Sequence, residues 1–401
     1  MSRLVRHPLN PAIRLMDPAF HAEPLAHYAW LRAHAPVYWD ADAPLWKGRG
    51  AWGISRYADI RAVHADHETF ASRFGSRPDA PPVPSMINRD APEHLARRGI
   101  NRRRFTPAAV RRYEAYVREV AVELIEGVRG RGGCDLVRDL AMPLPMRIIG
   151  RMMDLPDADY ARLLEWSDLI ATGLPEQTPE FIAAVLAAAA EFEAYITGWL
   201  ERRRVAPGDD LLSAIANARV LGDPLGAKDQ VHEALLLLVG GDETTRHVLT
   251  GGIVALLDQH DDWQALAAAP ARIPSAVEEM LRWVTPVKTI ARSVTRDVEL
   301  GGERLLAGDR VILLYESGNR DERAFDAPER FDIAREPNRH LAFGGYGRHH
   351  CLGAHLARLE IRVMLEELLA RLPKLARADA APLPRRHGTF VLGFEAVPVV
   401  F

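Results

Sequence analysis

Apolar residues along the chain recur mostly at the three- and four-residue spacing of helices, and only short stretches show the clustering typical of strands. The helical patterns lie at 25–34, at 57–65, from 91 onward, within 113–205, at 231–257, at 276–283 and after 351. Strand or hairpin patterns lie at 52–55, in the region that follows 286–292, and at 388–399. This distribution predicts a mainly α-helical fold with a smaller β region.

The helix predicted from Val231 to about Leu257 differs from the others, because the segment 234–239 is apolar on every face. Such a helix crosses the core instead of lying on the surface. Its middle, Gly240-Gly241-Asp242-Glu243-Thr244-Thr245, carries two helix-weakening glycines and acids that burial would penalise. The Thr244 hydroxyl can bond to the Gly240 carbonyl and open the helix there. A polar notch in an apolar helix predicts a functional site.

A glycine-rich loop precedes the last long helical pattern. Residues 340–358 read His-Leu-Ala-Phe-Gly-Gly-Tyr-Gly-Arg-His-His-Cys-Leu-Gly-Ala-His-Leu-Ala-Arg. Glycines permit unusual backbone dihedrals and the close approach of a flat ligand. Cys351 lies where the helix begins, and a helix N-terminus lowers the pKa of a thiol. With Arg348 and His349 beside it, a Cys351 thiolate is suited to the iron of a porphyrin that carries two propionates.

Two other interpretations of Cys351 are a buried structural cysteine and a zinc site that includes His349 and His350. A zinc site needs about four ligands. The other cysteine of the chain, Cys134, has no metal-type spacing around it. The loop therefore favours the porphyrin interpretation.

Composition and charge narrow the class of protein. The 401 residues are 48% hydrophobic and 26% charged, enough to bury one large core or two small ones. A formal net charge of −3 favours neither nucleic acid nor an anionic membrane, and two cysteines fit a reducing compartment. The chain starts without a secretory apolar run and has no uncharged apolar stretch of 18 residues. We expect a cytoplasmic protein without a membrane anchor.

The two motifs together resemble the bacterial soluble branch of the cytochrome P450 family. Four loop residues match the family pattern: Gly347, His349, Cys351 and Gly353. Phe343 lies eight residues before Cys351 instead of seven, so the loop has one extra residue, a spacing similar to that of a sterol-oxidising bacterial subgroup. The run 240–244 matches the family's oxygen-activation motif, (Ala/Gly)-Gly-x-(Asp/Glu)-Thr, about 107 residues before the cysteine.

The resemblance implies a cytochrome P450 fold, in which haem b (iron protoporphyrin IX) lies between the long central helix and the helix after Cys351. It implies a single domain over residues 1–401 with no fused reductase. Cys351 is the implied axial ligand of the haem iron, and Glu243 and Thr244 the implied catalytic acid and alcohol. The other implied haem contacts are His94, Arg98, Arg292, His349, Phe343, Gly344, Gly345 and Gly353. The implied structural residues are Glu279 and Arg282, an ion pair locked by Arg330.

An apolar substrate pocket is also expected. Helix spacing places Leu236, Val239 and Gly240 on the same side as Thr244. The full expected lining is Met86, Ile87, Leu236, Val239, Gly240, Val287, Ile290 and Phe390. Such a lining suits a steroid, terpenoid, fatty acid or macrolide-like molecule, with steroid or terpenoid favoured by the loop. Lys288 interrupts the apolar character. We expect Lys288 to point outward, the alternative being an inward side chain that meets a carboxylate or carbonyl of the substrate.

The implied activity is a haem-thiolate monooxygenase that uses O₂ and electrons from a ferredoxin and its NAD(P)H-dependent reductase. The basic run Arg102, Arg103, Arg104, Arg111 and Arg112 is either a solvated face or the ferredoxin-docking surface. Neither a nucleic-acid-binding fold nor aromatic interleaving accompanies the run, so nucleic acid is not an expected partner. Two alternatives are a peroxide-driven peroxygenase and a haem-binding sensor or carrier without turnover. Neither needs the acid–alcohol pair at 243–244.

Overall fold

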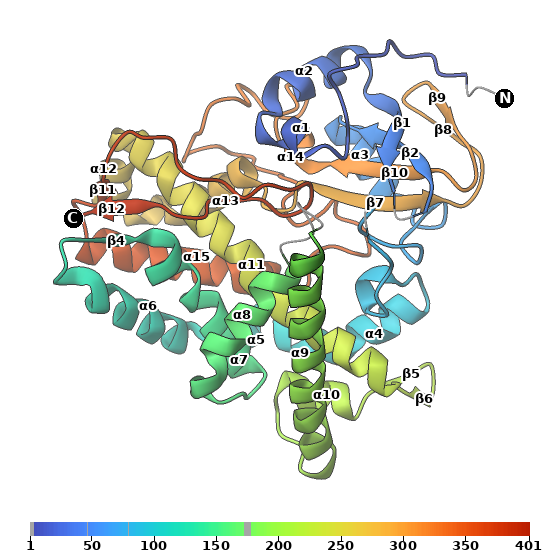
Figure 1. The fold of residues 1–401 in the computed structure, drawn as a ribbon. Helices are drawn as coiled ribbons and strands as arrows, with labels where there is room; N and C mark the ends of the chain where they lie inside the picture. Colours follow the sequence, from blue (N-terminus) through green and yellow to red (C-terminus); the bar gives the residue numbers. More distant parts are fainter. Residues whose placement is uncertain (1–3, 46, 79, 172–177) are drawn as a thin grey trace.

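The computed structural model of the protein describes residues 4–45, 47–78, 80–171 and 178–401. A helix-rich part and a β-rich part lie side by side, and the long helix α11 crosses the middle of the molecule (Figure 1). The helices are α1 Pro18–Ala22, α2 Leu25–His34, α3 Tyr57–Ala65, α4 Glu93–Arg102, α5 Pro107–Arg111, α6 Glu114–Arg129, α7 Pro143–Met152, α8 Tyr160–Ala171, α9 Pro179–Val205, α10 Leu211–Ala216, α11 Ala227–Asp258, α12 His260–Ala268, α13 Ile273–Val284, α14 Tyr315–Gly318 and α15 Ala354–Arg371. The predicted mainly α fold with a smaller β region is confirmed.

The strands are short and form four sheets. They are β1 Val37–Pro44, β2 Arg49–Ile54, β3 Phe70–Ala71, β4 Gly133–Asp135, β5 Arg219–Val220, β6 Asp223–Pro224, β7 Thr289–Val294, β8 Val298–Leu300, β9 Glu303–Leu305, β10 Arg310–Leu314, β11 Ala376–Arg377 and β12 Pro398–Val400. The largest sheet has the order β1-β2-β10-β7-β3, with β2 and β10 parallel and the other pairs antiparallel. Strand β7, which lies between β10 and β3, is buried along its whole length, which fixes the residues at its start against the rest of the molecule.

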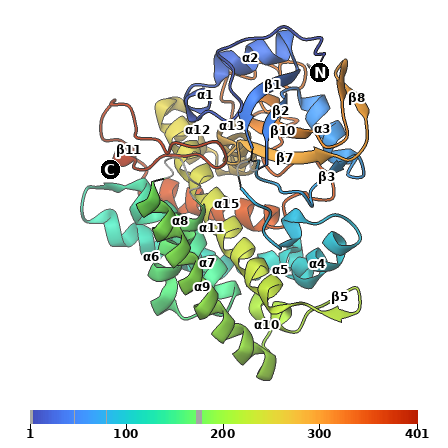
Figure 2. The same ribbon diagram turned by 45° about the vertical axis from the view of Figure 1, so that its right-hand side comes forward.

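Helix α11 is buried on most of its surface, as its sequence predicts. It packs against α7, α8, α13 and α15, which surround it in the helix-rich part (Figure 2). Ala234, Leu238, Leu249 and Ile253 are fully buried within the main apolar cluster. A helix that is apolar on all faces can keep its apolar surface away from water only inside the protein. Its burial places the polar run at 240–245 in the interior.

The segment before the last strand forms a hairpin that reaches from the edge of the molecule to β7 (Figure 1). Arg385 pairs with Phe394 across the hairpin, and Val391 pairs with Val287 just before β7. The Lys288 amide donates to the Phe390 carbonyl at 2.7 Å. A closing hairpin is present, but it pairs 384–386 with 393–395 instead of spanning the predicted 388–399, because β12 pairs with β11 and β4. These bonds hold its tip beside the first residues of β7.

Helix α9 is the one helix of the described residues long and apolar enough, by length and composition, to cross a membrane. Its most apolar 18-residue window has a mean hydropathy of 1.4 and is 17% buried. The same helix packs against α8, α10 and α11 and carries two acids, Glu191 and Glu193, within its apolar run.

Candidate active site

Thr244 and Gly240 lie one turn apart in the middle of α11. The Thr244 hydroxyl donates to the Gly240 carbonyl oxygen at 3.1 Å, as the sequence predicts. The helix nevertheless continues unbroken from 227 to 258, so the expected opening of its hydrogen-bond ladder is wrong. The side-chain bond is added to the backbone bonds instead of replacing them. Gly240 is exposed, and a Cβ built on it would meet nothing within 4 Å. This face of α11 therefore borders open space.

Glu243 lies on the buried side of α11 within a network of charges. One of its oxygens, Oε1, accepts hydrogen bonds from Arg246 and, at 2.9 Å, from Arg386 of the C-terminal hairpin. Burial raises the pKa of Glu243, but His247, Arg246 and Arg386 together lower it to about 2. The carboxyl is therefore ionised at neutral pH. Its other oxygen, Oε2, is buried without a hydrogen-bond partner among the described residues.

The cysteine loop lies between Phe343 and the first residue of α15. The Cys351 amide donates to the Phe343 carbonyl oxygen at 3.0 Å, which closes the loop around the extra residue. That residue can be identified with Tyr346, because its φ of 65° is left-handed and its side chain is 50% exposed. The insertion thus bulges outward, and it leaves Cys351 directly before α15 as the family pattern requires.

The Cys351 thiol is solvent-accessible, yet burial among its surroundings raises its pKa. The Gly353 amide, Arg98 and Arg358 oppose the rise by stabilising the thiolate. The expectation that the helix N-terminus lowers the pKa of Cys351 is wrong for the protein without haem, because desolvation of the thiolate is the larger effect.

Glycines 344, 345 and 347 shape the loop, but a contact with α3 explains two of them. A Cβ on Gly345 would lie 2.4 Å from the His64 ring, and one on Gly347 would lie 2.3 Å from the His64 carbonyl oxygen. Gly344 has a φ of 91°. Only Gly353 opens toward free space, with nothing within 4 Å of a Cβ. The haem contacts predicted for Gly344 and Gly345 stay predictions.

The residues predicted to bind the propionates come together although they lie on α4, β7 and the cysteine loop. The His94 and His349 rings are 3.9 Å apart, and Arg98 and Arg292 are close enough to lower the pKa of both rings. Burial is the larger cause, and it brings the pKa of His94 to about 4 and that of His349 to about 2. In the described part of the chain, neither Arg98 nor Arg292 forms an ion pair with a carboxylate.

These features fit a haem. The buried Arg292 and the half-buried Arg98 have no carboxylate partner among the described residues, and with the unpartnered Nδ1 of His94 they favour an anion such as a propionate. The open faces of α11 at Gly240 and of the loop at Gly353 provide room for a flat ring. Cys351, on the same loop, is exposed. The donor set is that of a haem-thiolate site, and a group of three or more metal-ligating side chains is absent from the described residues.

The predicted pocket residues are apolar and mostly half-buried or just buried. Leu236, Val239, Val287, Ile87 and Phe390 are half-buried; Met86 and Ile290 are 9% and 8% exposed. The hairpin brings Phe390 next to β7, and Arg77 covers the Phe390 ring at 4.8 Å from its centroid. Their roles as substrate contacts stay predictions.

Lys288 does not point outward. Its ammonium donates to Glu316 at 2.8 Å and to the Val284 carbonyl at 2.9 Å, and the residue is 8% exposed. The expectation failed because an acid on α14, 28 residues away, supplies the partner that makes burial tolerable. Two of the three N–H donors of the Lys288 ammonium are thus used by Glu316 and the Val284 carbonyl inside the protein.

The Glu279–Arg282 pair is fully buried, as predicted, but Arg330 does not lock it. Arg335 donates to Glu279 at 3.1 Å, and the exposed Arg330 contributes only its backbone carbonyl, which accepts from Arg282 at 3.1 Å. Asn338 adds a bond to Glu279 at 3.0 Å. Arg335 is five residues past Arg330, where the chain turns back toward α13.

Two residues that sequence reasoning missed are His64 and Arg97. His64 shares a 2.7 Å hydrogen bond with the Tyr315 hydroxyl and supports the cysteine loop. Arg97, on α4 between His94 and Arg98, is 4% exposed and pairs with Glu233 and Asp229 of α11. Both are ordinary polar residues on short helices in the sequence, and only their distant partners reveal their roles.

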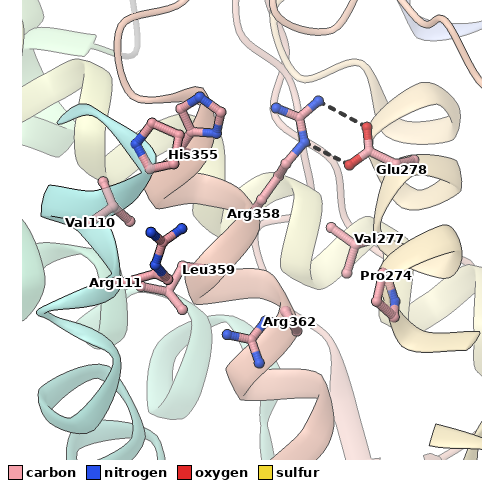
Figure 3. Close-up of a pocket in the computed structure, with 10 residues that line it drawn as sticks. Val110, Arg111, Pro274, Val277, Glu278, His355, Arg358, Leu359 and Arg362 are labelled. Carbon is pink, nitrogen blue, oxygen red and sulfur yellow. Dashed lines mark hydrogen bonds and ion pairs between the residues drawn. The ribbon is translucent and has the colours of Figure 1, made fainter. Parts of the chain in front are cut away.

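A cleft of about 230 Å³ opens between α5, α13 and α15, the helix that follows Cys351 (Figure 3). Val110, Val277 and Leu359 form its apolar walls, and Arg358 at its rim is paired in two bonds with Glu278. Arg111, which lines the cleft, and its neighbour Arg112 are exposed; Arg102 and Arg103 are also exposed, but Arg103 lines a different cleft, beside α4 and α10. Arg104 is not part of this face, because it is mostly buried and bonds to Asp209 at 2.9 Å.

Comparison with known proteins gives consistent matches. A family model described as Cytochrome P450 matches residues 271–393. A steroid C26-monooxygenase of Mycobacterium tuberculosis is 42% identical over 98% of this chain and 97% of its own length. A methyl-branched lipid omega-hydroxylase of Mycobacterium bovis is 38% identical over 93% of this chain and 90% of its own.

Solved structures agree in fold. A Mycobacterium marinum cytochrome P450 in complex with pseudoionone superposes with a TM-score of 0.92 at 35% identity, over 99% of this chain and 100% of that chain. A Bacillus megaterium cytochrome P450 in complex with testosterone gives 0.85 at 32% identity, over 96% and 99%.

Proposed function

The chain belongs to the cytochrome P450 family, and on this premise we propose that it is a ferredoxin-dependent monooxygenase that hydroxylates the side chain of a steroid. Its family makes it a monooxygenase acting on apolar substrates. The observation that carries the finer proposal is the near full-length similarity to steroid C26-monooxygenases, joined to an apolar lining at Phe390, Ile290 and Val287. Carbon 26 exists only in steroids that keep a long side chain, so the substrate class is a sterol.

A second substrate class has support of its own. The Mycobacterium marinum structure, with the highest TM-score quoted above, holds pseudoionone, a branched terpenoid ketone, and another relative hydroxylates methyl-branched lipids. A sterol side chain and these molecules share a terminal, methyl-branched hydrocarbon. We therefore propose that the pocket recognises that terminus.

The experiment that tests the function is a spectral and product screen of the haem-loaded protein with cholesterol, testosterone, pseudoionone and a methyl-branched fatty acid. Cholesterol is expected to displace the water on the iron and to yield a product hydroxylated at the end of its side chain. Testosterone lacks that side chain and serves as the matched control. Product from testosterone with none from cholesterol would contradict the proposal.

The site residues have two kinds of role: some would bind haem, and others would handle protons. A bound haem b would supply the activation of molecular oxygen; Cys351 would hold its iron, and His94, Arg98, Arg292 and His349 would hold its propionates. Glu243 is ionised and carries one free oxygen, so it can accept a proton and pass it toward the open face of α11. The Thr244 hydroxyl, which the Gly240 carbonyl holds in place, lies one turn from the exposed Gly240 on that face.

Thr244→Ala is expected to keep NADPH consumption within about threefold while product falls by roughly tenfold or more, the difference appearing as hydrogen peroxide. A positioned proton donor contributes on that scale. Thr245→Ala is the matched control, because Thr245 is buried on another face of α11 and hydrogen-bonds Glu360. Unchanged product yield in Thr244→Ala would remove this hydroxyl from the mechanism.

We also propose that an acidic ferredoxin docks at the cleft beside α15 and that the protein is cytoplasmic. Exposed cations surround an apolar cleft there, which favours a partner with carboxylates around an apolar side chain.

Arg111→Glu is expected to raise the KM for a ferredoxin roughly five- to tenfold at low ionic strength, with the effect shrinking as salt screens it. Arg304→Glu, which reverses an exposed charge on β9, is the control. Equal effects of the two substitutions would place the docking surface elsewhere.

A further inference from the structure

Four charged side chains from three separate segments close a ring beside the active site. Asp168 comes from α8, Glu243 and Arg246 from α11, and Arg386 from the C-terminal hairpin. Arg246 bonds to both acids, with 2.9 Å to Asp168. Arg386 also bonds to both acids, with 2.9 Å to Glu243. Each acid is therefore held by two guanidinium groups.

The ring runs from the interior to the edge of the protein. The side chains of Arg246 and Glu243 are 0% and 2% exposed, that of Arg386 is 15% exposed and that of Asp168 is 36% exposed. Buried charges of this kind are tolerated only when they are paired. Both arginines hold the same oxygen of Glu243, Oε1, so the position of Oε2 follows from theirs.

The two arginines belong to different segments of the chain. Arg246 is three residues from Glu243 on the same helix and moves with it. Arg386 is 143 residues away in sequence and belongs to the hairpin whose tip, Phe390, lies beside β7. The hairpin is also seated on α11, because a Cβ on Gly393 would fall 1.9 Å from the His247 ring.

We propose that Arg386 is a positioning residue for the acid Glu243, which it ties to the hairpin that borders the substrate pocket. The proposal rests on the proposed function in that Glu243 is taken as the residue that relays protons. It adds that the carboxylate is kept ionised and oriented by a segment outside α11. A substrate that shifts the hairpin tip thereby acts on the acid.

Removal of the Arg386 charge has a defined electrostatic result. Burial raises the pKa of Glu243, and the groups that lower it are His247 and Arg246 on α11 and Arg386 on the hairpin. Among the described residues, Asp242 on α11 and Asp168 on α8 also face this site, and both are acids that favour protonation of their neighbour. With Arg386 replaced by a neutral residue, the pKa of Glu243 rises, and the carboxyl takes up a proton as the pH falls.

The experiment compares Arg386→Gln, Arg386→Lys and Arg385→Gln in the haem-loaded protein. Arg385 is the exposed neighbour of Arg386 on the same hairpin and lies over Phe394, so it is the matched control. Infrared titration between about pH 4 and about pH 8 is expected to show, in Arg386→Gln alone, one protonated carboxyl in addition to those of buried acids such as Asp242 and Glu360, whose pKa burial raises in every variant. The band is assigned to Glu243 by its loss in the Arg386→Gln, Glu243→Gln double variant. This readout needs no substrate and is therefore independent of the proposed activity.

Turnover with cholesterol supplies the second readout. Arg386→Gln is expected to lose about tenfold in product per NADPH, to gain an acid limb in its pH profile, and to keep product formation driven by added hydrogen peroxide. Arg386→Lys restores the coupling, and Arg385→Gln matches the native protein. Absence of the infrared band in Arg386→Gln, or equal losses in the Lys and Gln variants, would overturn the proposal.

Discussion

Replacing Cys351 with serine is expected to abolish monooxygenase activity, by at least ~10³-fold, and to remove the thiolate-type absorption of the reduced, CO-treated protein. A serine hydroxyl is a weaker electron donor than a thiolate and cannot sustain the oxygen chemistry of a thiolate-bound haem. Losses on this scale are typical when a residue on which the catalytic unit depends is removed. The measurement is the CO difference spectrum together with product formation.

Cys134→Ser is the control for that experiment. Cys134 is half-buried on β4, where its backbone pairs with Val399, and burial raises the pKa of its thiol to about 12. It is therefore an inert thiol, and its replacement is expected to leave the spectrum and the activity unchanged. If a thiolate-type spectrum survives in Cys351→Ser, or disappears in Cys134→Ser, Cys351 is not the iron ligand.

Glu279→Ala is expected to lower the free energy of unfolding by about 3–5 kcal/mol, the cost typical of breaking a buried ion pair on one side. Glu279 accepts from Arg282 at 2.7 and 2.8 Å, from Arg335 at 3.1 Å and from Asn338 at 3.0 Å. Without the carboxylate, the fully buried Arg282 has no counter-charge. The measurement is urea-induced unfolding followed by tryptophan fluorescence and by haem absorbance.

The matched variants separate the two arginines that follow α13. Arg335→Ala is expected to be strongly destabilising, because it removes a side chain bonded to Glu279 and to three backbone carbonyl oxygens. Arg330→Ala is expected to change stability by less than about 0.5 kcal/mol, because only the backbone of that residue is used. Comparable losses in both variants would mean that the Arg330 side chain takes part after all.

The sequence predicted the elements whose function depends on neighbours along the chain. Cys351 before a helix, Thr244 one turn from Gly240, and His94 one turn from Arg98 follow from helix geometry alone. The apolar run at 234–239 likewise required that α11 be buried. Each of these is a local relation, so the chain order contains it.

Tertiary structure decided which partners the charged groups have. Lys288 turned inward because Glu316 receives it, Arg335 replaced Arg330 because the chain folds back there, and Glu243 is bound by Arg386 from the far end of the chain. The pKa of Cys351 rose because its surroundings desolvate it more than the nearby amide and guanidinium groups stabilise it. A charge in a low-dielectric interior is governed by whatever lies within a few ångströms, and residues far apart in sequence meet at that distance only in the folded protein.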